Sequence, residues 1–275
     1  MDPDTKYLDP PPPYEDVVGE GSDAPSLLQP PVTLLLDGQC IRDASSSAPL
    51  YRISRSVTTL PKTPPKNSSI IFERIENDNR VPEKPEGSGT RQQPQLHHRH
   101  LFYLAHPADA QYRTDIPGYY ITSVDTETVG NIHFETSKSR LQKTEFKALL
   151  SAKRTASDRP LFDEAGRTST LFTARPATLM SSRYTWTQKN GSQVAVEDGK
   201  GDEHRLAITT PMTQETRDAL VASWMLRLWY ETAESKQAKR EELERLTAPV
   251  SYQDWTYAKR VGGLGALAGA GAGGG

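Results

Sequence analysis

The sequence predicts a mainly β protein, a closed antiparallel β-barrel of roughly twelve strands around a C-terminal apolar helix. Short apolar segments recur at regular spacing from Val32 to Pro211, and turn residues separate them, which is typical of a sandwich or a barrel. A segment without glycine or proline follows, from Thr216 to about Leu246, and its first half is apolar in every direction around a helical repeat. A helix of this kind has to be enclosed, so we expect the strands to close around it.

The expected strands begin with a hairpin. Its turn is Asp37-Gly38, a dipeptide that is favoured in two-residue turns because both positions accept a positive φ. Residues 81–98 show no periodicity and contain several prolines and glycines, so we expect a mobile loop there. The other strands are expected within residues 50–57, 69–76, 100–106, 118–124, 128–135, 145–153, 169–176, 182–188, 192–198 and 205–211.

Composition divides the chain into four regions. Residues 1–30 are acidic and rich in proline, with too little apolar surface to offset the entropy lost on folding, so we expect a disordered tail. The barrel and its central helix are assigned to residues 31–235, with Thr213 as the candidate N-cap. A charged extension of the helix is expected over 236–248, and a disordered tail rich in glycine and alanine over 249–275.

Charge and cysteine content narrow the class of protein. Lys and Arg total 33 against 35 Asp and Glu, a formal net charge of -2, which does not favour a nucleic-acid partner. The single cysteine, Cys40, rules out an internal disulfide and is typical of a reducing compartment. The N-terminal sequence does not resemble a signal peptide, and the most apolar stretch is shorter than the roughly 20 residues that span a bilayer. We expect a cytoplasmic protein whose contact with membranes, where there is one, is peripheral.

Catalytic motifs are not found in the sequence. It has no nucleophile elbow, phosphate-binding glycine loop, zinc-protease histidine pair or dinucleotide fingerprint. We therefore predict a protein that is not an enzyme, with no catalytic residues and no cofactor. An enzyme whose site is assembled from separated residues remains the alternative.

Two groups of side chains are candidate metal ligands. Asp125 and Glu127 are candidate calcium ligands, but they supply fewer oxygen atoms than calcium prefers and suit a polar β-turn better. Imidazoles bind transition metals, yet three of the four histidines lie in or beside a segment expected to be mobile, whereas metal ligands need a rigid frame. We therefore predict no metal site. The four histidines are His97, His98, His100 and His106.

The N-terminal region contains a candidate WW-domain ligand. Pro11, Pro12, Pro13 and Tyr14 match the Pro-Pro-x-Tyr (PPxY) motif, and Pro10 extends the proline run. Prolines populate the polyproline II helix before binding, so a WW domain can hold the segment at a low entropic cost. The expected partner is a WW-domain protein such as a HECT-type ubiquitin ligase. The alternative is a proline spacer that happens to carry a tyrosine.

Three segments resemble the tubby C-terminal-like superfamily, which includes LURP-one-related proteins and phospholipid scramblases. They are VDTETVGNI at 124–132, YTWTQKNGSQVAVED at 184–198 and RDALVASWMLRLWYE at 217–231. The last two are most similar to uncharacterised fungal members. The resemblance covers about 32–235 and implies a closed barrel that wraps its C-terminal helix.

The resemblance also implies a surface for lipids, because tubby domains bind phosphoinositides through basic residues on an outer face. The central region of the chain is comparatively basic, and Lys147, Lys153 and Arg154 are the candidate lipid-binding residues. The alternative is that these residues belong to the alternating charges that keep surface strands soluble.

The function we expect is that of a non-enzymatic adaptor. Its barrel would contact a membrane lipid or a protein surface, and its tail would recruit a WW-domain protein. The alternative is lipid handling of the scramblase kind, which would need a membrane-spanning helix and is disfavoured by Arg227 and by the short apolar stretch.

Overall fold

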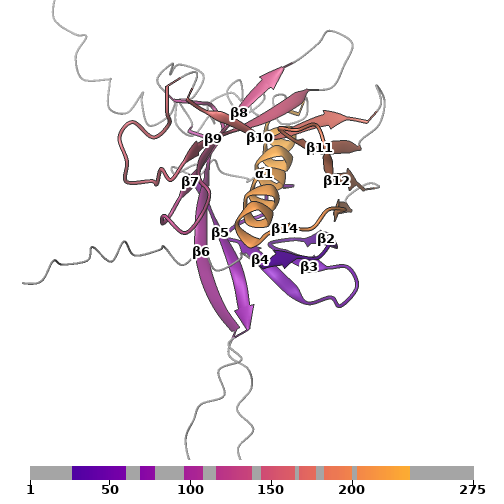
Figure 1. Ribbon diagram of the computed structural model, residues 1–275. Coiled ribbons are helices and arrows are strands. Elements are labelled where there is room, and N and C mark those ends of the chain that lie inside the picture. Colours follow the sequence, from indigo (N-terminus) through magenta and orange to yellow (C-terminus); the bar gives the residue numbers. More distant parts are fainter. Residues whose placement is uncertain are drawn as a thin grey trace, which may run out of the picture.

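The computed structural model describes residues 27–59, 69–77, 96–107, 116–137, 144–164, 167–177, 183–199 and 203–235. In this part of the chain, twelve strands form a closed antiparallel barrel, and one helix lies inside it (Figure 1). The predicted fold class is therefore confirmed.

The barrel follows the simplest antiparallel order. Each strand pairs with the next strand in the chain, and the last barrel strand pairs with the first, so that Val32 lies opposite Ile208. The strands are β2 (Val32–Asp37), β3 (Cys40–Asp43), β4 (Pro49–Ile53), β5 (Ser69–Asn77), β6 (Leu96–Ala105), β7 (Tyr120–Ser123), β8 (Gly130–Ser137), β9 (Glu145–Ala152), β10 (Ser169–Pro176), β11 (Tyr184–Gln188), β12 (Gln193–Asp198) and β13 (His204–Ile208).

Glycines in the turns and the alternation of buried and exposed side chains explain where the strands form. Gly38 has φ 61° in the predicted hairpin turn, and Gly191 has φ 80° in the turn between β11 and β12. Glycine adopts such angles without a steric penalty. Along β9, Phe146 and Ala148 are buried while Lys147 between them is exposed, because successive side chains point to opposite faces. One face of the closed sheet thus lines the interior.

The helix α1 (Gln214–Ala233) begins where the sequence predicts. The hydroxyl oxygen of Thr213 accepts a hydrogen bond from the backbone N–H of Thr216 at 3.3 Å, and Glu215 lies in the first turn. Both features stabilise a helix N-terminus, where backbone N–H groups lack partners inside the helix.

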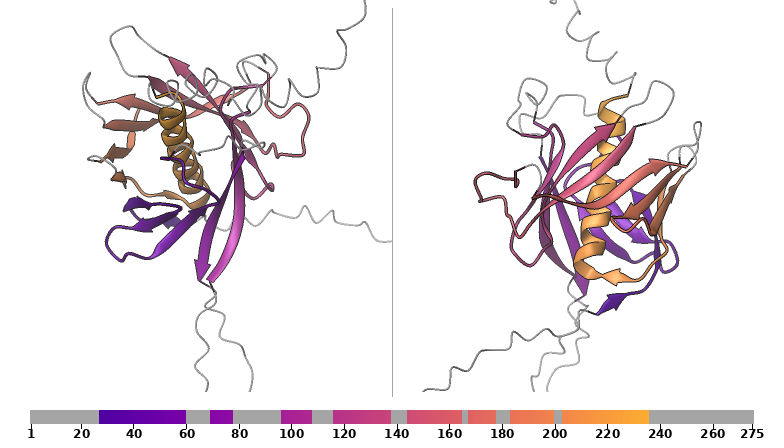
Figure 2. Two further views of the ribbon diagram at one scale, coloured as in Figure 1. Left: turned by 180° about the vertical axis from the view of Figure 1, so that it is seen from behind. Right: turned by 45° about the horizontal axis from the view of Figure 1, so that its top comes forward.

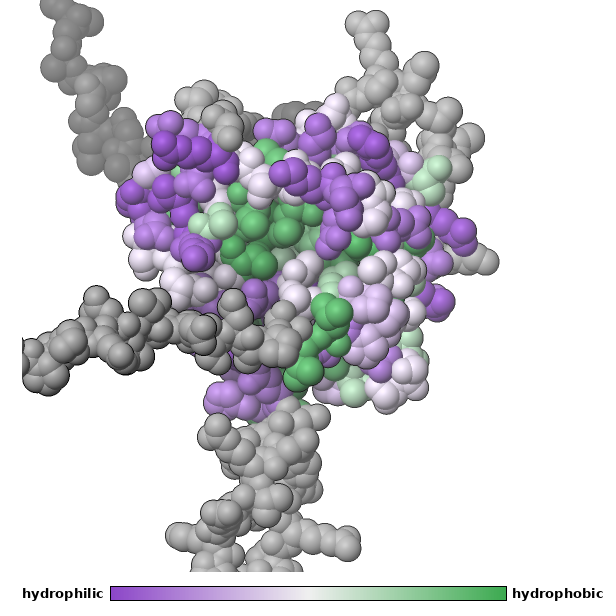
Figure 3. Space-filling view, viewed as in Figure 1, coloured by the Kyte–Doolittle hydropathy of each residue, from purple (hydrophilic) through white to green (hydrophobic). Residues whose placement is uncertain are grey.

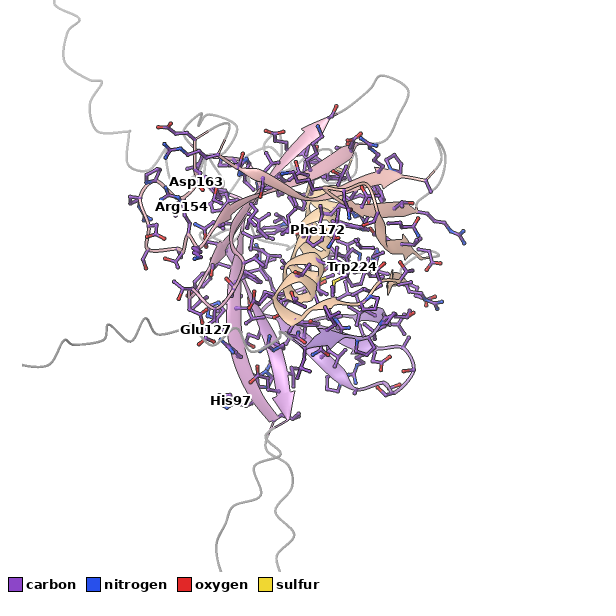
Figure 4. All side chains as sticks on the ribbon, in the orientation of Figure 1. His97, Glu127, Arg154, Asp163, Phe172 and Trp224 are labelled. Atoms are coloured by element: carbon purple, nitrogen blue, oxygen red, sulfur yellow. The ribbon has the colours of Figure 1, made fainter. Side chains whose placement is uncertain are left out.

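Strands surround α1 (Figure 2). Every residue from Arg217 to Tyr230 is buried, which confirms the prediction of an enclosed helix. Figure 4 shows Trp224 on α1 and Phe172 on β10 in the middle of the molecule, and both are fully buried. The interior of the barrel is filled by the helix and by the side chains that meet it.

A second, two-stranded sheet was not predicted. β1 (Leu28–Gln29) pairs with β14 (Met212–Thr213), directly before α1. The guanidinium of Arg217 also donates a hydrogen bond to the carbonyl oxygen of Pro30. These contacts attach the start of the described chain to the N-terminal end of the helix.

The structure changes one boundary and leaves others open. β6 begins at Leu96, so the last three residues of the loop predicted over 81–98 belong to a strand, where they pair with β5. Residues 81–95 lie outside the described part of the chain, as do residues 1–26, 236–248 and 249–275.

The face shown in Figure 3 is mostly hydrophilic, with a large apolar area near its centre and a smaller apolar strip below it. The larger area lies in the region where Figure 1 places β7 and α1, and hydrophilic side chains lie around it.

Candidate functional site

The basic residues predicted to bind lipid do not gather in one cluster. Lys147 is exposed in β9, and Lys153 is exposed directly after its end. Six residues of extended chain correspond to about 20 Å. Arg154 is engaged within the protein, since its Nε donates to Asp163 Oδ1 at 2.6 Å and its Nη1 to Pro160 O at 3.0 Å. Figure 4 shows Arg154 and Asp163 beside each other, away from α1.

Arg154 is part of a compact loop over residues 153–164 that is organised by a buried asparagine. The Nδ2 of Asn131 donates to Thr155 O at 3.0 Å and to Leu161 O at 2.7 Å. Its Oδ1 accepts the backbone N–H of Ser123 at 2.8 Å. One side chain therefore ties β7, β8 and both halves of the loop together. Compact surface loops of this kind are frequently functional.

The glycine that precedes Asn131 is required by close backbone contact. Gly130 has φ +118°, and a Cβ at this position would lie 2.4 Å from Ser151 O and 2.7 Å from the backbone nitrogen of Lys153. A larger residue would push β9 away and displace the loop. The Val-Gly-Asn-Ile pattern of the sequence thus holds the 153–164 loop against the barrel.

The acidic turn before this pattern pairs with an arginine of the same chain. The guanidinium of Arg99 on β6 bonds to the carboxylate of Glu127 and lies 3.7 Å from that of Asp125. Asp125 Oδ1 also accepts the backbone N–H of Glu127 at 2.8 Å, as a polar turn requires. Figure 4 shows Glu127 beside β6, with His97 near the end of that strand. In the described part of the chain, no group of three or more His, Cys, Asp or Glu is placed to hold a metal ion.

Inside the barrel, a buried carboxylate fixes the N-terminal half of α1. Asp218 accepts hydrogen bonds from Tyr51 Oη at 2.8 Å, Gln214 Nε2 at 2.6 Å and Arg74 Nη1 at 2.5 Å. Burial raises the pKa of Asp218, and Arg74 opposes this effect. Because three donors satisfy the carboxylate, the cluster joins α1 to β4 and β5.

A second buried pair fixes the C-terminal half of α1. Arg227, which is 1% exposed, bonds through Nη2 to Glu197 on β12 and through Nη1 to Glu231 Oε2 at 2.8 Å. Its Cζ lies 4.3 Å from the ring centre of Tyr184, a cation–π distance. Burial raises the pKa of Glu197, while the positive charge of Arg227 lowers it. Both interior clusters thus hold the helix in a defined register.

Sequence reasoning missed the partners of these buried charges. Arg217, Asp218 and Arg227 stand out as charged residues in an otherwise apolar helix, which is a usable signal. Their partners on the strands carry no such signal, because Arg74 is 144 residues away from Asp218.

One half-buried histidine leads to a pH prediction. His133 on β8 packs edge-on against Phe162 of the 153–164 loop, and its Nδ1 is buried without a hydrogen-bond partner among the described residues. Burial lowers its pKa below the ordinary 6.5. In acid the unfolded chain therefore binds a proton before the folded protein does, and stability falls as the pH drops from about 6.5 to the folded-state pKa.

We therefore expect His133→Gln to flatten the decrease in melting temperature between about pH 7 and pH 5. The exposed His97→Gln is the matched control and should keep the wild-type slope. Melting curves at a series of pH values test this, and equal slopes for all three proteins would contradict it.

The predicted WW ligand, Pro11 to Pro13 with Tyr14, lies outside the described residues. The structure does describe where the chain that follows it joins the barrel. The β1–β14 pairing and the bond from Arg217 to Pro30 place that junction beside the N-terminal end of α1.

The described part of the chain contains no helix with the length and hydropathy needed to cross a bilayer. Comparison with known proteins gives no match to any protein-family model, curated protein or solved structure.

Proposed function

We propose that this protein is a non-enzymatic adaptor that recruits a WW-domain protein through Pro11, Pro12, Pro13 and Tyr14. The observation that carries the proposal is the complete PPxY motif, which twelve residues separate from the first described residue, Leu27. The interior charges of the barrel support a scaffold role. The carboxylates of Asp218 and Glu197 and the guanidinium of Arg227 are engaged with groups of the same chain, as in a stable support for a ligand-bearing segment.

The spacing between motif and barrel suits recruitment. Residues 15–26 can span at most about 40 Å when extended, and a flexible chain of this length has an end-to-end distance of about 20 Å. A WW domain on Tyr14 would thus stay close to the barrel without having to contact it. The β1–β14 pairing holds the other end of this connection beside α1.

A peptide that spans Leu8 to Val18 should bind isolated WW domains of HECT-type ubiquitin ligases with micromolar affinity. The reason is that WW domains hold a polyproline II segment in one aromatic groove and take the tyrosine into a second pocket. Titration calorimetry with the wild-type peptide and with Tyr14→Ala measures this directly. Equal weak binding by both peptides would mean that the segment is only a spacer. In the full chain, the matched control is Tyr7→Ala, which removes a tyrosine outside the motif.

For the second contact of the adaptor we propose the barrel surface around the 153–164 loop. Lys153 and Arg159 are exposed there, and the Nη1 of Arg159 is held by the carbonyl oxygens of Ala156 at 3.1 Å and Asp158 at 2.7 Å. Exposed basic groups contribute about 1 kcal/mol each near an anionic membrane. We propose a lipid with an anionic headgroup as the partner of this surface.

Charge reversal at Lys153 should weaken sedimentation of the protein with phosphatidylserine vesicles, and so should added salt. Lys147→Glu changes the same charge about 20 Å away and is the matched control. Vesicle binding that is equal for wild type and Lys153→Glu at low salt would remove this surface from the proposal.

A further inference from the structure

Arg55 lies in the loop after β4, beside the C-terminal half of α1. The backbone N–H of Ser54 donates to Ile71 O at 3.0 Å, and the hydroxyl of Ser54 accepts the N–H of Ile71 at 3.0 Å, so this loop is attached to β5. The Cζ of Arg55 lies 4.7 Å from the ring centre of Trp229 on α1. The guanidinium is therefore held in a defined place over an indole ring.

One edge of this guanidinium is unused. Nε and Nη2 of Arg55 are buried and have no hydrogen-bond partner among the described residues. These two N–H groups share the edge that matches two oxygen atoms of a carboxylate or a phosphate. Arg74 shows the same edge in use, because its Nε and Nη2 both donate to one carboxylate oxygen, Oε1 of Glu76. Burial lowers the pKa of Arg55, and no described carboxylate offsets this effect.

A second unpaired donor flanks the same indole. Tyr119 is 7% exposed, and its buried hydroxyl has no partner in the described part of the chain. Its ring is perpendicular to that of Trp229, at a centroid distance of 6.3 Å and an interplanar angle of 87°. His106 stacks on Tyr119, with ring centroids 4.0 Å apart and an interplanar angle of 5°. Arg55 and Tyr119 thus both contact Trp229, and each carries a buried donor without a partner among the described residues.

Negative groups near Tyr119 weaken the binding of an anion at this end of α1. Burial raises the pKa of Tyr119, and the carboxylate of Glu234 raises it further. The C-terminal end of a helix also carries partial negative charge. An anion at this end of α1 therefore has to pair directly with Arg55, and we expect affinities in the millimolar range.

We propose that Arg55, Tyr119 and Trp229 form a binding site for a small carboxylate or phosphate anion. Nε and Nη2 of Arg55 hold two oxygen atoms of the anion, and the hydroxyl of Tyr119 is the second donor that the site offers to the ligand. The aromatic side chains offer a surface for the flat part of an aromatic carboxylate. Nothing in this site depends on the PPxY motif.

The test measures the melting temperature and binding heat of the full chain in Tris chloride at constant ionic strength. Inorganic phosphate and benzoate are the two probes, and each should raise the melting temperature of the wild type as its concentration increases. Arg55→Met should weaken binding at least about tenfold, because it removes a charge-assisted pair of hydrogen bonds. Arg55→Lys keeps the charge but lacks the paired donors and should also bind more weakly. Tyr119→Phe should show a smaller loss.

Arg52→Met is the matched control, because Arg52 is an exposed arginine on β4 outside the site. It should bind both probes as the wild type does. In buffer without either probe, Arg55→Met should keep the wild-type melting temperature or exceed it, since it removes unpaired buried donors. A fall of more than about 4 °C would show that Arg55 has a structural role and would overturn the proposal.

A vesicle-binding experiment distinguishes a lipid headgroup from a soluble anion as the ligand. Binding to phosphatidic acid vesicles that Arg55→Met abolishes would assign a lipid headgroup, whereas binding to the free probes alone would assign a soluble anion. If the wild type binds neither probe at about 20 mM nor the vesicles, or if Arg55→Met binds them equally well, the site does not exist.

Discussion

Leu228→Asp is expected to abolish cooperative folding. Leu228 is 2% exposed on the enclosed helix α1, so a carboxylate at that position would be out of contact with solvent. Burying an unpaired charge costs several kcal/mol against a total stability of about 5–15 kcal/mol for a domain of this kind. Urea unfolding followed by circular dichroism and by tryptophan fluorescence measures the loss.

The matched control is Leu27→Asp. It makes the same chemical change at a residue that is 83% exposed. The free energy of unfolding should stay within about 0.5 kcal/mol of the wild-type value. A Leu228→Asp protein that unfolds at the wild-type midpoint would refute the enclosure of α1.

Arg227→Met is expected to destabilise the protein by about 3–5 kcal/mol, because it leaves the carboxylate of Glu197 buried without its counter-charge. The double variant Arg227→Met, Glu197→Leu should recover most of this loss, since an apolar pair of similar volume can replace a buried ion pair. Urea unfolding of the single and double variants gives the coupling between the two side chains.

The Arg227→Met variant should also depend on pH in a distinctive way. Burial raises the pKa of Glu197, and removal of Arg227 takes away a group that lowers it. The folded protein then binds a proton more readily than the unfolded chain, so its stability falls as the pH rises above about 4.5. Relative to the wild type, the variant should be less destabilised at about pH 5 than at pH 7. Equal losses in the single and double variants at both pH values would mean that the ion pair is not coupled.

Much of the fold could be predicted because its signals are local. Asp37-Gly38 specifies a hairpin through the φ angle that the glycine accepts, and Thr213 specifies a helix start through its own hydroxyl. The enclosure of α1 follows from its sequence alone, because a helix that is apolar on all sides cannot face water. The strand series predicts a barrel or sandwich, and the helix selects the barrel.

The candidate sites depend on the tertiary structure. Arg154 looks like a free basic residue in the sequence, whereas in the fold its Nε bonds to Asp163. The unpaired edge of Arg55 becomes visible only when Trp229 and Tyr119 are placed around it, because they come from segments far apart in the chain.

The same holds for the closing pair of strands, β2 and β13, and for the bond between Arg74 and Asp218, which joins residues 144 positions apart. Local sequence determines which segments become strands or helix, since turns, caps and hydrophobic period act over a few residues. Which charged groups meet is decided by barrel closure, because only the complete barrel excludes the water that would otherwise solvate each of them separately.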